Sequence, residues 1–302
     1  MMKRNSLRDE IGKKVLLFDG GMGSMIISAG LGRNDVPEAW NITNPEAIID
    51  MHAAFIEAGA EIVQTNTFGG SRLKLESSDA GRALDPVEVN EKAVELGRRA
   101  LDRHGGEGCF LGGDIGPTGL FFPPVGTLTA REAHRAFKEQ AQILERAGID
   151  CFIIETMYDI REAMEALRAV REITDRPAFV EITFETKPSG YFTMMGDSPE
   201  KIAEPLLAAG ADMIGANCTI SSSEMIDLVE EFTLVTDAPL LFQPNAGNPA
   251  MEHGIPVYRQ RPQEFADDIE KIVRAGASAV GGCCGTTPDF IRAVHDRLTH
   301  GR

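Results

Sequence analysis

Eight short apolar runs alternate along the chain with longer segments that carry apolar residues at helical spacing. The runs are rich in Val, Ile and Phe and show little polar alternation, as is typical of parallel strands covered on both faces. They are residues 15–20, 61–68, 109–116, 150–157, 178–185, 211–218, 239–246 and 278–284. This alternation predicts an α/β protein, a single (β/α)8 TIM barrel with its active site at the C-terminal face. A doubly wound open sheet is the alternative architecture.

Local signals place several helix ends. Thr129 followed by Glu132 fits a capping box. Three further N-cap candidates stand before a proline at the first helical position, namely Asn44, Ser198 and Thr287. Helices are predicted over residues 46–58, 131–147 and 262–275. The dipeptide Ala-Gly precedes each even-numbered strand, which predicts left-handed helix ends at Gly59, Gly148, Gly210 and Gly276.

The longest connections that follow a strand come after the second, third and seventh strands, at residues 69–86, 120–127 and 247–261. None of them has the composition of a linker, so residues 1–302 are predicted to form one domain. These connections should lie on the C-terminal face of the barrel, where active sites of this fold are built.

Composition and charge exclude some classes of partner and indicate a cellular compartment. The chain of 302 residues has a formal net charge of −16, which argues against nucleic acid and anionic membrane as partners because their phosphates would be repelled. Five cysteines, two of them adjacent, suit a disulfide framework poorly. The N-terminus has no apolar run of signal-peptide length. We therefore expect a reduced, cytoplasmic protein.

Polar residues at the predicted strand ends outline the candidate active face. In chain order they are Asp19, Thr65, Asn66, Thr67, Asp114, Glu155, Thr156, Glu185, Asn217, Cys218, Asn245, Cys283 and Cys284. Lysine and histidine are absent from this set, which argues against a Schiff-base aldolase and against a histidine metal site or general base. What remains is acidic, amide and thiol.

Cys218, Cys283 and Cys284 stand at the ends of the sixth and eighth predicted strands. Three thiolates with an open fourth position are typical of a catalytic zinc site, because structural zinc sites are closed by four protein ligands. Adjacent residues of a regular strand face opposite ways, so the neighbouring glycines must permit a local distortion.

Two alternatives stay open for this region. One is that the three cysteines are small buried apolar residues. The other is that the stretch from Gly285 to Pro288 cradles a phosphate at a helix N-terminus, as in many barrels of this kind. Cys109 and Cys151 open their strands at the opposite end of the barrel and are predicted to be core residues.

With these residues laid out, the chain resembles the homocysteine S-methyltransferase family, and within it the homocysteine-binding barrel of the cobalamin-dependent methionine synthase type. The matching stretches keep the family order over nearly the whole chain and are specific only together. They are residues 18–24 (FDGGMGS), 57–60 (EAGA), 64–69 (QTNTFG), 113–119 (GDIGPTG), 155–156 (ET), 215–218 (GANC), 243–247 (QPNAG) and 281–288 (GGCCGTTP). Residues 40–46 (WNITNPE) resemble the cobalamin type rather than the betaine type.

The resemblance implies one zinc ion per chain, bound by Cys218, Cys283 and Cys284, with the sulfur of homocysteine as the fourth ligand. It also implies that carboxylates at Asp19 and Glu155 hold the amino group of homocysteine. The alternatives are that Asp19 forms a turn before the glycines and that Glu155 is a paired structural acid.

The resemblance implies further contacts around the substrate. The carboxylate of homocysteine should meet backbone N–H groups near Gly20, Gly21 and Ser24, and polar groups of Thr65 and Asn66. Two amides should orient the site by hydrogen bonds, namely Asn217 and Asn245. That Asn245 is a resting fourth zinc ligand, released when substrate binds, is a further hypothesis.

The expected chemistry follows from charge. A free thiol is mostly protonated at neutral pH, whereas coordination to zinc deprotonates it. Three further thiolates keep the bound sulfur electron-rich enough to attack a methyl group, so the transfer that converts homocysteine to methionine needs no general base.

The methyl donor is expected to come from elsewhere. The chain ends at Arg302 without room for a corrinoid-binding module, so a separate methyl-corrinoid protein is the expected partner. The alternatives are S-methylmethionine or a betaine-like donor, another thiol or selenol acceptor, a non-catalytic thiol-binding subunit, and the phosphate-binding barrel.

Overall fold

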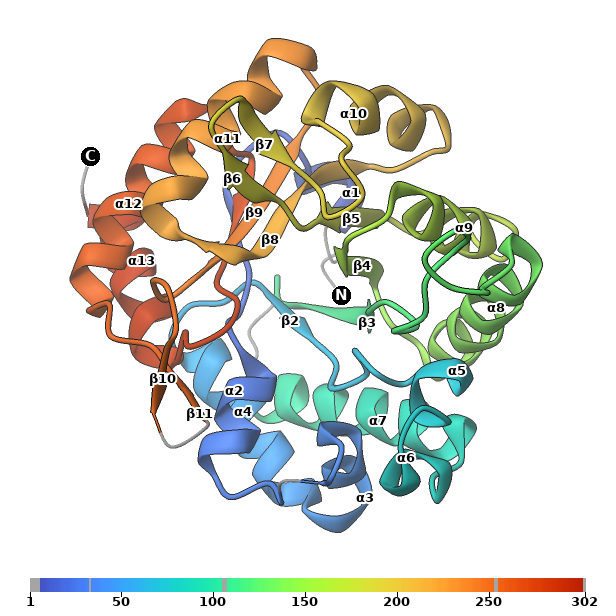
Figure 1. Cartoon of the computed structure of the whole chain (residues 1–302). Coiled ribbons are helices and arrows are strands. Elements are labelled where there is room, and N and C mark those ends of the chain that lie inside the picture. Colours follow the sequence, from blue (N-terminus) through green and yellow to red (C-terminus); the bar gives the residue numbers. More distant parts are fainter. Residues whose placement is uncertain (1–5, 33, 105–107, 253–254, 301–302) are drawn as a thin grey trace.

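The computed structural model describes residues 6–32, 34–104, 108–252 and 255–300, and within them eight parallel strands form a barrel (Figure 1). The strands are β1 (Leu16–Leu17), β2 (Ile62–Gln64), β3 (Phe110–Ile115), β4 (Cys151–Met157), β5 (Ala178–Ile182), β8 (Met213–Ser221), β9 (Leu240–Asn245) and β12 (Ala279–Val280). Each falls within or overlaps one of the eight predicted runs.

The barrel closes between its first and second strands. From β2 onward each strand pairs in parallel with the next barrel strand along the chain, and β12 pairs with β1 through Leu16 and Ala279. A parallel bridge between Phe18 and Ile62 joins the two remaining edges. The predicted (β/α)8 TIM barrel is therefore confirmed, and the open sheet is wrong.

One long helix follows each barrel strand and covers its outer face (Figure 1). These helices are α4 (Pro45–Glu57), α7 (Pro86–His104), α8 (Ala130–Ala147), α9 (Ile160–Arg171), α10 (Pro199–Ala208), α11 (Ser222–Val235), α12 (Pro262–Ala275) and α13 (Pro288–His300). No helix of the described residues combines the length and apolarity that crossing a membrane requires.

The predicted helix ends are largely observed. Thr129 and Glu132 form the reciprocal capping box at the start of α8. Asn44 and Ser198 precede their helices, but neither side chain makes a capping hydrogen bond. The four predicted helix-terminal glycines all have positive φ, at 104° for Gly59, 97° for Gly148, 99° for Gly210 and 126° for Gly276.

The connections at the C-terminal ends of the strands carry short elements that the sequence pattern did not reveal. These are α2 (Met22–Ser28), η1 (Pro37–Ala39), α3 (Trp40–Thr43), α5 (Arg72–Leu75), α6 (Asp79–Arg82) and the hairpins β6–β7 (Glu185–Lys187, Gly190–Phe192) and β10–β11 (Ala250–Glu252, Ile255–Val257). The placement of Glu185 at the end of the fifth barrel strand was wrong. That strand ends at Ile182, and Glu185 lies on the exposed hairpin, where it pairs with Lys187.

Two apolar clusters build the core. One fills the barrel with residues from all eight strands, including Phe18, Phe179 and Met213, and the other lies between the strands and the surrounding helices. Cys151 belongs to the inner cluster and is confirmed as a core residue, whereas Cys109 is half-buried and packs against the outer cluster.

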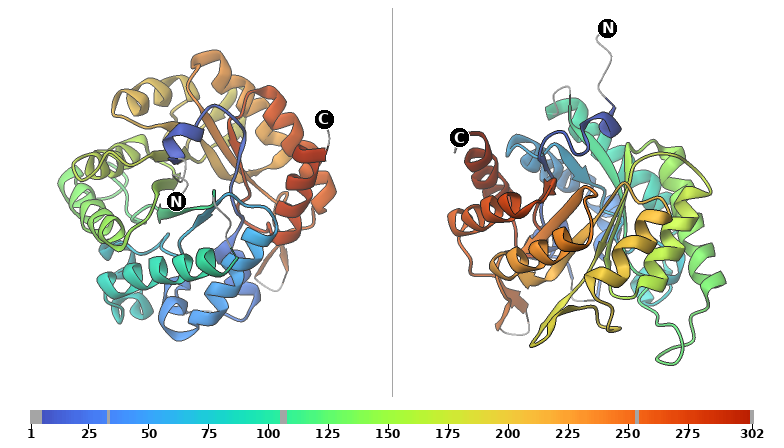
Figure 2. Two further views of the ribbon diagram at one scale, coloured as in Figure 1. Left: turned by 180° about the vertical axis from the view of Figure 1, so that it is seen from behind. Right: turned by 90° about the horizontal axis from the view of Figure 1, so that it is seen from above.

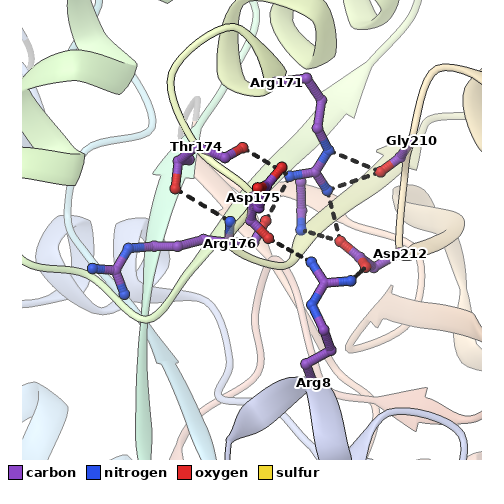
Figure 3. Close-up of polar contacts among 8 residues, drawn as sticks. Arg8, Arg171, Thr174, Asp175, Arg176, Gly210 and Asp212 are labelled. Carbon is purple, nitrogen blue, oxygen red and sulfur yellow. Dashed lines mark hydrogen bonds and ion pairs between the residues drawn. The ribbon is translucent and has the colours of Figure 1, made fainter.

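The N-terminal helix α1 (Leu7–Glu10) covers the end of the barrel opposite the two hairpins (Figure 2). Leu7 is buried with the inner cluster. Arg8 donates to Asp212 Oδ1 and to the carbonyl of Asp175, both at 2.5 Å (Figure 3). Asp212 Oδ2 also accepts from Arg171 at 2.6 Å and from the Ala178 N–H at 2.9 Å, so one carboxylate ties α1 to the start of β5.

Replacing Asp212 should therefore destabilise the fold. Asp212→Ala removes the shared acceptor of two guanidinium groups and one backbone N–H, and we expect a loss of about 2–3 kcal/mol in the free energy of unfolding. Urea unfolding followed by circular dichroism measures it. Asp79→Ala, which removes an exposed partner of Arg82, is the matched control and should change little. Equal effects of both variants would contradict the role given to Asp212.

Candidate metal and substrate site

The sulfur atoms of Cys218, Cys283 and Cys284 all lie within 4.8 Å of one another at the C-terminal end of the barrel. The sulfurs of Cys218 and Cys284 are 3.9 Å apart. Residues separated by 65 positions in the sequence are thus brought together because β8 and the loop after β12 flank the same neighbour, β9.

Cys218 reaches this position through an irregularity in β8. The register between β8 and β9 shifts between Asn217 and Ser221. Cys218 and Thr219 have φ values of 56° and 54°, in the left-handed region that residues other than glycine rarely adopt. Such conformations cost about 1 kcal/mol or more each and concentrate at functional sites.

Cys283 and Cys284 lie in a loop, because β12 ends at Val280. Backbone hydrogen bonds seat this loop: the Gly282 N–H donates to the Asp19 carbonyl and the Cys283 N–H to the Pro244 carbonyl, both at 2.9 Å. Of the three glycines expected to permit a distortion, only Gly285 has positive φ, at 81°. Gly282 serves close packing instead, since a Cβ there would lie 2.3 Å from Thr286 Oγ1.

The three neighbouring thiols shift one another's pKa values. Hydrogen bonds from Cys218 and Cys283 lower the pKa of Cys284 to about 3, and the same contacts raise the pKa of Cys283 well above its usual range. The contacts within the cluster thus favour the thiolate of Cys284 over that of Cys283.

The donor set fits zinc. A tetrahedral ion with Zn–S bonds of about 2.3 Å holds its sulfurs about 3.8 Å apart, close to the Cys218–Cys284 separation of 3.9 Å. Within the described part of the chain, no further Cys, His, Asp or Glu atom joins this group, so a fourth position would remain for another ligand.

Three buried carboxyl groups, from Asp19, Asp114 and Glu155, interact with one another, and Glu155 also interacts with Cys284. Asp19 Oδ2 accepts the Gln64 N–H at 2.9 Å, whereas Asp19 Oδ1 and Asp114 Oδ1 have no hydrogen-bond partner among the described residues. Burial raises the pKa of Asp19 and of Asp114 well above their usual range, and that of Glu155 to about 7. These acids retain protons more readily than exposed ones unless a cation approaches.

Asn217 connects the carboxylates to the thiols. Its Nδ2 donates to Glu155 Oε2 and, at 2.8 Å, to Thr156 Oγ1, and it lies 3.9 Å from the Cys283 sulfur. Its Oδ1 accepts the Thr156 N–H at 2.9 Å, which supports the left-handed φ of 59° at Thr156. Asn217 thus orients the site from behind and does not line the cavity.

The other predicted amides hydrogen-bond to groups of the protein itself. Asn245 Oδ1 accepts the Cys284 N–H at 3.1 Å, so its oxygen holds the cysteine loop. Asn66 Nδ2 donates to the Pro37 carbonyl and to Asn41 Oδ1, both at 2.9 Å, and so anchors the segment after α2. Thr65 Oγ1 lies 2.7 Å from Thr67 Oγ1 and accepts the Asp114 N–H at 3.1 Å.

The loop after β1 packs against the cysteine loop. The Gly21 N–H donates to Thr286, and Ser24 Oγ accepts the Gly285 N–H at 3.0 Å. A Cβ at Gly20 would lie 2.6 Å from Thr286 Oγ1, so glycine is needed for this approach. Gly20, Gly21 and Ser24 all line the cavity, and α2 begins between them, at Met22.

One cavity of about 1200 Å³ contains the three cysteines together with Asp114 and Glu155. Much of its wall is apolar, including Met22, Met51 and Phe68. Among the described residues that line it, Lys74 is the one basic side chain.

Two residues near the site were missed from the sequence. Glu181 on β5 is fully buried, and neither carboxylate oxygen has a partner among the described residues. Glu181 stands two residues after Phe179, which fills the barrel, and alternate residues of a strand point to the same side. This spacing could have identified Glu181, rather than Glu185, as the acid that the fifth barrel strand supplies. Tyr258 follows the β10–β11 hairpin and contacts Cys284, and no periodicity points to it.

Comparison with known proteins supplies the context. A family model described as homocysteine S-methyltransferase matches residues 16–298. Methionine synthases of Mycobacterium leprae and Mycobacterium tuberculosis are 30% and 31% identical over 95% of this chain, which spans only 24% and 25% of their lengths. The metallated form of the homocysteine methyltransferase MmuM from Escherichia coli superposes with a TM-score of 0.78 at 23% identity, covering 95% of this chain and 97% of that one, which shows the shared fold.

Glu181 yields a test of the buried charge. Burial, and then the neighbouring Glu155, raise the pKa of Glu181 well above its usual value, so the folded state keeps a proton that the unfolded chain releases. The stability contributed by this proton is present below about pH 4.5 and is lost as the pH rises. We expect Glu181→Gln to gain stability relative to wild type between pH 5 and 8, by up to about 1.4 kcal/mol per pH unit.

Urea unfolding at several pH values provides the measurement. The matched control is Glu185→Gln on the exposed hairpin, which should follow the wild-type profile. Parallel wild-type and Glu181→Gln profiles would show that Glu181 is ionised without penalty in the folded protein.

Proposed function

The chain belongs to the homocysteine S-methyltransferase family, and on that premise we propose that it binds one zinc ion through Cys218, Cys283 and Cys284 and methylates homocysteine to methionine. The observation that carries the proposal is the convergence of three sulfurs in a cavity that Glu155 and Asp114, with its unpartnered Oδ1, also line. Sulfur ligands select zinc, and unpartnered buried carboxylates favour a cationic group such as an amine.

Different residues of the site would then bind different groups of the substrate. Asp19 Oδ1, which lacks a partner, and the carboxyl of Glu155 would receive the ammonium group, and its charge would lower their raised pKa values. The first turn of α2, entered at Gly21, offers backbone N–H groups to the carboxylate. Asn217 holds Glu155 in place between these contacts and the sulfurs.

Zinc bound by these cysteines would hold an incoming thiol as its thiolate at neutral pH, which is the state that accepts a methyl group. The protein's own part is to fix the three sulfurs, exclude water with the apolar cavity wall and set the direction of the substrate. Keeping these thiols reduced fits the cytoplasm, and we propose that residues 1–302 act there as one domain.

The donor is proposed to be a methylated corrinoid protein supplied separately. A cavity of about 1200 Å³ exceeds the range of about 300–1,000 Å³ typical of small-molecule pockets, which leaves room for a bulky donor above a bound amino acid. The chain spans about a quarter of the methionine synthases it matches, so their whole activity and partners are not carried over.

Metal analysis tests the zinc site. Purified wild-type protein should contain about one zinc per chain, and Cys283→Ser should retain less than about a tenth of it, because two thiolates do not hold zinc as three do. Cys109→Ser, at the far end of the barrel, is the matched control and should keep full stoichiometry. A wild-type protein that lacks zinc after purification and cannot be reconstituted would contradict the proposal.

A methyl-transfer assay on homocysteine tests the donor. Methylated corrinoid protein should support methionine formation faster than free methylcobalamin, S-methylmethionine or betaine, and Cys283→Ser should abolish the reaction with every donor. Fastest transfer from S-methylmethionine or betaine would replace the corrinoid donor while leaving the acceptor site in place. Transfer to another thiol or a selenol in preference to homocysteine would overturn the proposed acceptor.

A further inference from the structure

Two hydroxyl groups lie near the sulfur of Cys284, and the proposed chemistry gives neither of them a role. The neighbouring thiols of Cys218 and Cys283, and then the hydroxyls of Tyr258 and Ser24, lower the pKa of Cys284, and Ser24, Tyr258 and Cys284 line the same cavity wall. Ser24 lies in the first turn of α2 and accepts the Gly285 N–H, which fixes its position. Among the described residues, no backbone group hydrogen-bonds the Tyr258 hydroxyl in this way, so packing must position Tyr258.

Tyr258 reaches the sulfur from outside the barrel. It directly follows β11, in the hairpin that projects beyond the C-terminal ends of the strands (Figure 2). Its ring packs onto Gly285, where an added Cβ would lie only 2.2 Å from Tyr258 Cγ. Any other residue at 285 would displace the ring, in addition to straining a backbone with φ of 81°.

The backbone of Cys284 is fixed on both sides. Its N–H donates to Asn245 Oδ1 at 3.1 Å, and its carbonyl accepts the Ala246 N–H at 3.0 Å. With the backbone held, the rotation of the side chain decides whether the sulfur faces the other two. A hydroxyl beside the sulfur selects one rotation, as outer hydrogen bonds do for metal ligands in general.

We propose that Tyr258 is a positioning residue that donates a hydrogen bond to the Cys284 sulfur and holds that sulfur toward the metal, an inference that rests on the zinc site of the proposed function. A phenol is protonated at neutral pH and a thiolate can only accept, so the direction of the hydrogen bond is fixed. The β10–β11 hairpin thereby becomes part of the metal site as well as of the cavity wall, to which Val257 and Tyr258 contribute.

Removing the hydroxyl while keeping the ring isolates this contact. Tyr258→Phe should bind zinc about 10-fold more weakly than wild type in competition with a chelator, because outer hydrogen bonds contribute about 10–100-fold to metal affinity. With cobalt in place of zinc, the sulfur-to-metal charge-transfer absorption should shift. Tyr158→Phe is the matched control, since the Tyr158 ring packs on Phe121 at 5.3 Å, and it should leave both readouts unchanged.

The outcomes separate the two proposals. Unchanged zinc affinity and an unchanged cobalt spectrum in a folded Tyr258→Phe would overturn the role of Tyr258, whereas a wild-type protein that binds no zinc would overturn the proposed function itself. If Tyr258→Phe does not fold, 3-fluorotyrosine can be incorporated at all three tyrosines of the otherwise unaltered chain. Its more acidic hydroxyl should shift the cobalt spectrum, and an absent shift would overturn the inference.

Discussion

The site depends on the backbone hydrogen bonds that seat the loop after β12 between its two neighbours. Gly282 donates to Asp19 at the end of β1, and Cys283 donates to Pro244 on β9. These bonds form because β12 lies between β1 and β9 and pairs with both. The pairing of the last strand with the first therefore fixes the distance between Asp19, which follows the first strand, and the thiols that follow the last.

Strain in the backbone is confined to the residues that this arrangement needs. Among the described residues, the three with positive φ that are not glycine are Thr156, Cys218 and Thr219, at or near the carboxyl ends of β4 and β8. Asn217 stabilises the first directly, and the pairing of β8 with β9 resumes at Ser221 beyond the other two. Each left-handed residue costs about 1–3 kcal/mol, which is sustained because regular pairing surrounds it.

The parts of the structure that could be predicted are those that a repeating sequence pattern encodes. The strands and long helices carry a repeating apolar pattern, so both they and the set of residues at the strand ends could be predicted. Glu185 was misplaced because three further polar or aromatic residues extend the apolar run past the true strand end at Ile182 into a hairpin. The commitment of Asn66 to Pro37 and Asn41 could not be predicted, since that short helical segment has no period and its position is set by tertiary contacts alone.

Charge balance explains why so many acids gather around thiols. Asp114 and Glu155 line the cavity with the three cysteines, Asp19 interacts with Glu155, and Lys74 is the one basic residue among the described residues of the cavity wall. Like charges in a buried site are unfavourable, so the acids retain protons when nothing else compensates them. A divalent metal at the sulfurs and an ammonium group at the carboxylates would supply the missing positive charge from opposite sides. An amino acid that carries both an amine and a thiol would meet both requirements at once, whereas a simple thiol would meet only one, and this difference would give the proposed site a physical basis for selecting its substrate.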